Sequence, residues 1–134
     1  MAETLESFLA AWNVDPNHAK DALLAFKQLL TEADVSFEFK ARPSISYSLR
    51  ARHKAQKQRE LFVLMDVIDD EPDQRWLSVC FYADMVSDPD EVADFVPKGL
   101  LGEDACCFNL EDHNPSMQAY IAERLREALN HAKC

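Results

Sequence analysis

The sequence predicts a single α+β domain over residues 1–134, with two layers: helices at both ends of the chain cover one face of an antiparallel, meandering sheet of about five strands. Three observations lead to this fold class. Apolar residues recur at helical spacing up to about residue 32 and again after residue 114. Between residues 35 and 82 they follow strand patterns instead, and the loops there are short enough for antiparallel neighbours. A chain of 134 residues can bury a core of its own.

The helices are predicted from apolar stripes and from their first residues. Residues 5–12 carry a stripe that predicts an opening helix. Asp15-Pro16 is typical of a helix start, because Asp suits the N-cap and Pro suits the first helical position, and it predicts a second helix to about Glu32. Asn114-Pro115 predicts the start of a closing amphipathic helix in the same way.

Five strands are predicted from alternating apolar and polar residues and from one continuous apolar run. They span Val35–Lys40, Ser44–Arg50, Leu61–Ile68, Trp76–Tyr82 and Ala105–Leu110. The third strand is almost continuously apolar, so we expect it at the centre of the sheet and covered on both faces.

The segment between the last two predicted strands is expected to contain no strand. Asp88-Pro89 repeats the helix-start signature and predicts a short helix to about Phe95. Lys98–Gly102 is predicted to be a turn.

Composition excludes several functions. Gly99 and Gly102 are the only glycines, so neither a phosphate-binding loop nor a dinucleotide-binding turn can be assembled, and the nucleophile elbow of serine hydrolases is absent. No apolar run approaches the ~20 residues of a membrane span. The first residues carry acids where a signal peptide carries lysine or arginine, which predicts a cytoplasmic location and no membrane partner.

The four cysteines are predicted to be free, because a reducing compartment disfavours disulfides. Cys80, Cys106, Cys107 and His113 lack the paired spacing of a zinc site, and adjacent cysteines on a strand point to opposite faces. We therefore expect no metal and no cofactor. No spacing of cysteine, serine and histidine selects a catalytic set either.

Charge is unevenly distributed along a chain of net charge −10. No acid falls between Glu38 and Glu60, whereas the segment from Glu60 to Asp112 is strongly acidic. The basic stretch has no interleaved aromatic residue to stack a base, and the acidic remainder would repel a phosphate polymer, so nucleic acid is disfavoured as a partner. Exposed aromatic residues on the uncovered face of the sheet would suit a protein partner instead. The candidate binding residues are Arg50, Arg52, Lys54, Lys57, Arg59, Tyr47, Trp76 and Tyr82.

Self-association is the mechanism that this polarity suggests. Successive antiparallel loops lie at opposite ends of a sheet, so one end is expected to be basic around Arg52–Arg59 and the other acidic around Asp69–Asp73. The basic segment of one copy could meet Asp69–Asp73 or Asp84–Asp94 of a second copy. We expect a cytoplasmic, non-enzymatic, protein-binding or chaperone-like module that acts as a homodimer.

The alternative is a small-molecule-binding or enzymatic domain with its site between the sheet and residues 84–104. Such a site would use Tyr82, Asp84 and Glu103. A buried carboxylate with a raised pKa there would favour this alternative, and solvated carboxylates would count against it.

The predicted order of elements resembles small bacterial α+β proteins with the secretion-chaperone-like architecture, a group that includes the type III secretion chaperones and the domain resembling the TfoX N-terminal region. The resemblance covers residues 16–132 and lies in element order and acidic charge. It implies a small, dimeric binder of other proteins. The basic loop Arg52–Arg59 is longer than this pattern expects, the tract Leu77–Asp84 looks closer to uncharacterised bacterial proteins, and no functional residue carries over.

Overall fold

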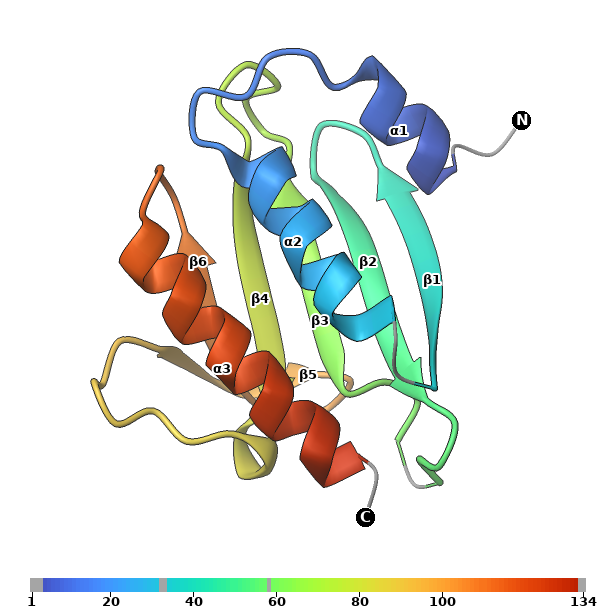
Figure 1. Cartoon of the computed structure of the whole chain (residues 1–134), viewed down its shortest axis with the longest axis vertical. Helices are drawn as coiled ribbons and strands as arrows, with labels where there is room; N and C mark the ends of the chain where they lie inside the picture. The colour runs from blue at the N-terminus through green and yellow to red at the C-terminus, as the bar shows by residue number, and fades with distance from the viewer. Residues whose placement is uncertain (1–3, 32–33, 58, 133–134) are drawn as a thin grey trace.

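The structure, a computed structural model, describes residues 4–31, 34–57 and 59–132. Its centre is one open antiparallel sheet in the order β1-β2-β3-β4-β6-β5 (Figure 1). The strands are β1 (Val35–Arg42), β2 (Ser46–His53), β3 (Val63–Ile68), β4 (Trp76–Tyr82), β5 (Asp94–Leu100) and β6 (Glu103–Leu110). The α+β class is therefore confirmed, with six strands in place of about five.

Three helices lie on one face of the sheet (Figure 1). They are α1 (Leu5–Ala11), α2 (Ala19–Thr31) and α3 (Pro115–Ala132), and a short 3₁₀ turn, η1 (Ala83–Met85), follows β4. None of the helices in the described part of the chain is both long and apolar enough to cross a membrane.

The predicted caps are present, but one helix begins later than expected. Asn114 Oδ1 accepts the Met117 N–H at 3.1 Å, so α3 starts where the sequence predicts. Asp15 accepts the backbone N–H groups of Ala19 and Lys20 at 2.8 and 3.0 Å, while His18 has a φ of 58° that interrupts the helix before Ala19. The predicted end of this helix at Glu32 lies outside the described residues.

The core lies between the helices and the sheet, and β3 occupies the predicted central position between β2 and β4. Val63, Met65 and Val67 of β3 are buried against the helices, whereas the alternate residues of β3 are only half-buried. The expectation that this strand is covered on both faces is wrong, because all three helices pack on the same side.

The predicted short helix after Asp88 is wrong, and β5 takes its place. The Asp88 carboxylate accepts the N–H groups of Val92 and Ala93 at 3.1 and 2.9 Å, which closes a turn instead of starting a helix. The chain then pairs with β6, with Asp94 opposite Cys107. The predicted turn is correspondingly shorter, because β5 continues to Leu100.

Cys80 and Cys107 form a disulfide between β4 and β6, so the prediction that these cysteines are free is wrong. The strand register sets them directly opposite each other on the face away from the helices. Cys106 is free and half-buried on the other face of β6, as expected for neighbours on a strand. Cys134 lies outside the described residues.

Candidate functional site

Arg59 brings together residues from both predicted sites. Its guanidinium donates to Asp84 at 2.9 and 3.0 Å and to Glu103 at 2.7 and 3.1 Å. It also lies over the ring of Tyr82, 4.1 Å from the ring centre. A predicted binding residue of the basic loop therefore contacts all three residues of the alternative, enzymatic site.

This cluster is an ion network in which one arginine faces two carboxylates. The hydrogen bonds from Arg59 lower the pKa of Asp84, and those same bonds raise the pKa of Arg59. Burial raises the pKa of Tyr82, and the charge of Glu103 acts in the same direction. The side chains of Asp84 and Glu103 are 68% and 47% exposed, so neither is a buried carboxylate of the kind that would favour the alternative site.

The other basic candidates remain at the surface. Arg52, Lys54 and Lys57 are exposed. Arg50 is half-buried, reaches Glu38 only at 4.0 Å, and its Nε is a buried donor without a hydrogen-bond partner. With Arg59 bound to two carboxylates, the exposed side chains among the predicted basic residues are those of Arg52, Lys54 and Lys57.

The aromatic candidates are mostly not at the surface. Tyr47 faces the helices and stacks on Phe8 with a ring separation of 4.0 Å. Tyr82 is buried under Arg59. Trp76 alone is half-buried. The expectation of partly exposed aromatics is therefore wrong for Tyr47 and Tyr82, because a helix covers one and an arginine covers the other.

The acidic loop after β3 is partly structural. Asp69 is buried, accepts from Arg75 Nε at 2.7 Å and accepts the Ser44 N–H at 2.8 Å. Arg75 in turn lies over the rings of Phe8 and Trp12, at 5.1 and 5.3 Å from their centres. Asp69 therefore fixes this end of the sheet and is not available to a second molecule.

A row of polar side chains on the uncovered sheet face was not predicted. Ser48, Asp66, Ser78 and Asn109 lie side by side across four strands. The Ser48 hydroxyl donates to Asp66, and Ser78 donates to Asn109 at 2.8 Å. Burial raises the pKa of Asp66, although Ser48 and two nearby arginines act against it. The alternation of Ser and Asp along the strands was the available signal.

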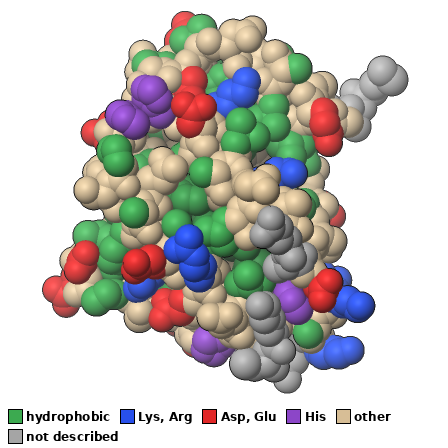
Figure 2. All heavy atoms as spheres, in the orientation of Figure 1, with side chains coloured by type: hydrophobic (Ala, Val, Ile, Leu, Met, Phe, Trp, Pro, Cys, Tyr) green, Lys and Arg blue, Asp and Glu red, His purple; other side chains and the backbone are tan. Residues whose placement is uncertain are grey.

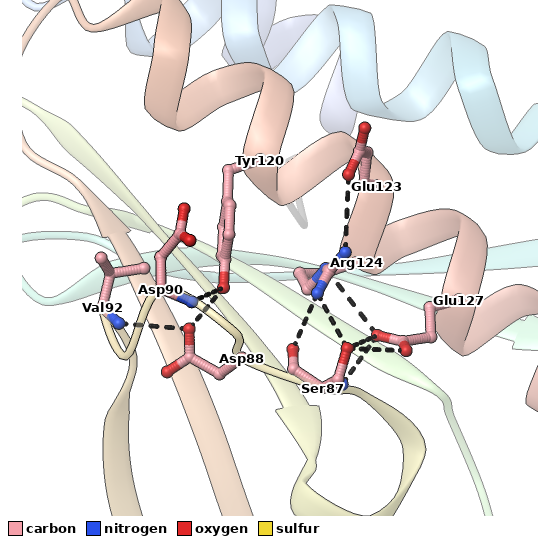
Figure 3. A network of polar contacts seen from close by, with 8 residues as sticks. All are labelled: Ser87, Asp88, Asp90, Val92, Tyr120, Glu123, Arg124 and Glu127. Carbon is pink, nitrogen blue, oxygen red and sulfur yellow. Dashed lines mark hydrogen bonds and ion pairs between the residues drawn. The ribbon is translucent and has the colours of Figure 1, made fainter.

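The segment that leads into β5 is anchored to α3 (Figure 3). The Tyr120 hydroxyl donates to Asp88 at 2.6 Å. The Ser87 N–H donates to Glu127 at 2.7 Å, and Arg124 donates to the Ser87 carbonyl at 3.1 Å. These contacts hold residues 87–93 in one place, so β5 is presented by an anchored segment.

That segment and β5 expose four large apolar side chains, which we call the edge patch: Val92, Phe95, Val96 and Leu101. Their exposed fractions are 45%, 58%, 39% and 53%. Phe95 lies opposite Cys106 and Val96 opposite Ala105, so these two side chains point to opposite faces of the sheet at its edge. Figure 2 shows hydrophobic and acidic side chains next to one another at the lower left, over the segment that leads into β5. The exposed acids nearest in sequence are Asp90, Glu91, Asp94, Glu103 and Asp104.

Within residues 4–31, 34–57 and 59–132, no three His, Cys, Asp or Glu side chains are placed to share a metal ion. No protein-family description matches the chain, and no curated protein and no solved structure does. Any statement about function therefore rests on the chemistry of these surfaces.

Proposed function

We propose that this protein is a non-enzymatic, chaperone-like protein-binding module that acts as a homodimer, and that the edge patch docks its protein partner. The observation that supports this docking site is the number of exposed apolar side chains on and next to β5. Of seven large hydrophobic side chains that are exposed in the described residues, four fall within residues 92–101. Concentrated apolar surface with a polar rim is typical of protein contact sites.

The charge around the edge patch defines the chemistry of the partner. Seven acids lie between Asp84 and Asp104, and Lys98 is the one cation there. Two of these acids, Asp84 and Glu103, share the single positive charge of Arg59. The remaining carboxylates favour a basic segment that lies along the edge, with apolar side chains that reach Phe95 on one face and Val96 on the other.

The same cluster weighs against the enzymatic alternative. The side chain of Asp84 is 68% exposed and that of Glu103 is 47% exposed, and Arg59 donates hydrogen bonds to both. We also propose a cytoplasmic location for the protein. The disulfide between Cys80 and Cys107 counts against this location, because a reducing cytoplasm would keep both residues as thiols, and trapping of free thiols in intact cells tests it.

Binding of a synthetic probe peptide tests the docking surface. A fluorescent peptide of alternating lysine and leucine should bind, and the same peptide with glutamate for lysine should not. The double variant Phe95→Ser/Val96→Ser should weaken binding of the basic peptide about tenfold, because it removes the apolar anchors. Fluorescence anisotropy measures both.

The matched control is Val14→Ser/Leu24→Ser, which removes two exposed hydrophobic residues elsewhere on the surface. It should leave the affinity unchanged. Equal binding of the two peptides, or an affinity that the Phe95→Ser/Val96→Ser variant does not change, would reject the edge patch as the docking site.

A further inference from the structure

The two edges of the sheet differ in a way that bears on self-association. At one edge, β5 carries Pro97 and a register shift between Val96 and Leu100. Proline and bulges are devices that protect an edge from pairing with another strand. At the other edge, β1 pairs with β2 over eight consecutive residues without a shift and contains no proline. It lies open at the right of Figure 1.

The outward backbone groups of β1 follow from its inward bonds. The Lys54 N–H donates to the Asp34 carbonyl at 2.8 Å, and the Ile45 N–H donates to the Arg42 carbonyl at 2.9 Å. In an antiparallel ladder, bonding toward one neighbour alternates along the strand. The even-numbered residues are thus bonded toward β2. The N–H and C=O groups of Phe37, Phe39 and Ala41 point to the free edge.

The side chains of β1 leave room on both faces. On the helix side, Phe37 and Phe39 are only half-buried and border a cavity of about 540 Å³ that also touches Leu5 and Lys27. Ser36 and Glu38, on the uncovered face, border a second cavity of about 400 Å³, which is also lined by Arg50 and Arg52 and by apolar residues including Phe37 and Leu61. An added strand would therefore find space for apolar side chains on one face and for polar ones on the other.

We propose that the occupant of this edge is β1 of a second copy, paired antiparallel about a twofold axis through Phe39. The proposal rests on the homodimer part of the proposed function and specifies its interface. Phe39 lies opposite the partner's Phe39, and Phe37 lies opposite the partner's Ala41. Glu38 lies opposite the partner's Lys40, and by symmetry Lys40 lies opposite the partner's Glu38.

Charge complementarity selects this register. Opposed residues of antiparallel strands point to the same face, so a shift by one residue would set phenylalanine against charged side chains. Moving the axis by one residue toward either end sets Glu38 against its own copy or Lys40 against its own copy. Like charges directly opposite each other destabilise strand pairing. Only the axis at Phe39 pairs each of these two charges with its opposite.

The backbone fits the same register. The outward N–H of Phe39 meets the C=O of the partner's Phe39, and the reverse bond forms by symmetry. Phe37 and Ala41 supply the next pairs with their outward groups. One sheet then continues through both copies, and the half-buried phenylalanines of the two β1 strands are adjacent on its helix side.

Charge reversal tests the register in the full chain, with native mass from light scattering as the readout. Glu38→Lys alone sets lysine opposite lysine, and Lys40→Glu alone sets glutamate opposite glutamate. Each single variant should dissociate about tenfold more readily than wild type in low salt, because two attractive pairs become repulsive. A mixture of the two variants should form a heterodimer, since every opposed pair is again of opposite sign.

Circular dichroism of each variant establishes that it is folded, and formation of the heterodimer shows that both chains are competent to pair. A wild type that stays monomeric at high concentration would overturn the proposal, and peptide binding by the edge patch would be unaffected by that result. Two further outcomes also overturn it: a dimer insensitive to both charge reversals, and a dimer lost in Phe95→Ser/Val96→Ser, which would assign self-association to the edge patch.

Discussion

At the scale of single residues, Arg59 connects three parts of the chain that lie far apart in sequence. It joins the loop before β3 to η1 and to the start of β6 through Asp84 and Glu103. Its own side chain is 23% exposed, so the ion pairs are partly screened by solvent. Arg59 therefore has a structural role in this account, and its removal should affect stability.

Arg59→Gln should lower the free energy of unfolding at pH 7 by about 1 kcal/mol. The pKa of Asp84 is lowered in the folded protein, so its contribution is present above its ordinary pKa of 3.8 and is lost as the pH falls below that value. The difference in the free energy of unfolding between Arg59→Gln and wild type should become smaller at acidic pH. Urea unfolding at several pH values measures this, with the exposed Arg52→Gln as a control expected to change little.

The charge of Asp66 should affect the free energy of unfolding in the opposite direction to that of Asp84. Burial raises its pKa above the ordinary 3.8, so the charged form destabilises the fold at pH 7 and this cost disappears as the pH falls below the ordinary value. Asp66→Asn keeps an oxygen that accepts from Ser48 and should increase the free energy of unfolding at pH 7. The gain should vanish near pH 3. A loss of stability at pH 7, with no change for the exposed Asp73→Asn, would contradict it.

Side-chain partners and the buried face of a strand could be predicted from the sequence only in part. Periodicity identifies Arg59 as part of a basic loop, but its partners lie 25 and 44 positions away and their approach depends on the packing of three segments. Tyr47 lies on a strand, as predicted. The alternation of tyrosine with serine does not show whether the face with Tyr47 or the face with the serines packs against α1. Local patterns specify which residues share a face, and tertiary packing decides which face is buried.

At the scale of elements, the regular strands were predictable and the segment 88–102 was not. Alternation of apolar and polar residues indicated β1, β2 and β4 to within a few residues. The Asp-Pro signature at residue 88 failed because the Asp88 carboxylate closes a turn and accepts from Tyr120, a contact with α3 that the local sequence does not contain. Pro97 also made a strand at β5 hard to predict, because proline is unfavourable inside a sheet and is tolerated only in edge strands.

The disulfide between β4 and β6 gives an element-scale prediction. Cys80 and Cys107 are 27 positions apart, and closing a loop of that length restricts the unfolded chain. Reduction should therefore lower the free energy of unfolding by about 3 kcal/mol. Chemical unfolding with and without reductant measures it. Cys106→Ala should keep the full response to reductant, whereas a Cys80→Ala/Cys107→Ala variant should lose it; an equal response in both would contradict the assignment.

At the scale of the whole molecule, the α+β class and the helices on one face followed from periodicity, from the helix-start residues and from the order of the elements. The expected separation of a basic and an acidic end is reduced in the structure, because Arg59 is neutralised by two acids and Asp69 is paired with Arg75. What remains is a sheet with a protected edge beside an apolar, acidic surface and an open edge with self-complementary charges. Those two edges are the basis of the proposed protein binding and self-association.

The native mass of the wild-type chain, measured by light scattering over a range of protein concentrations, tests this account most directly. We expect a dimer of about twice the 15.3 kDa chain mass, which the Glu38→Lys variant shifts toward the single chain under the same conditions. A mass of one chain throughout the range would contradict it. So would a dimer that Glu38→Lys leaves unchanged.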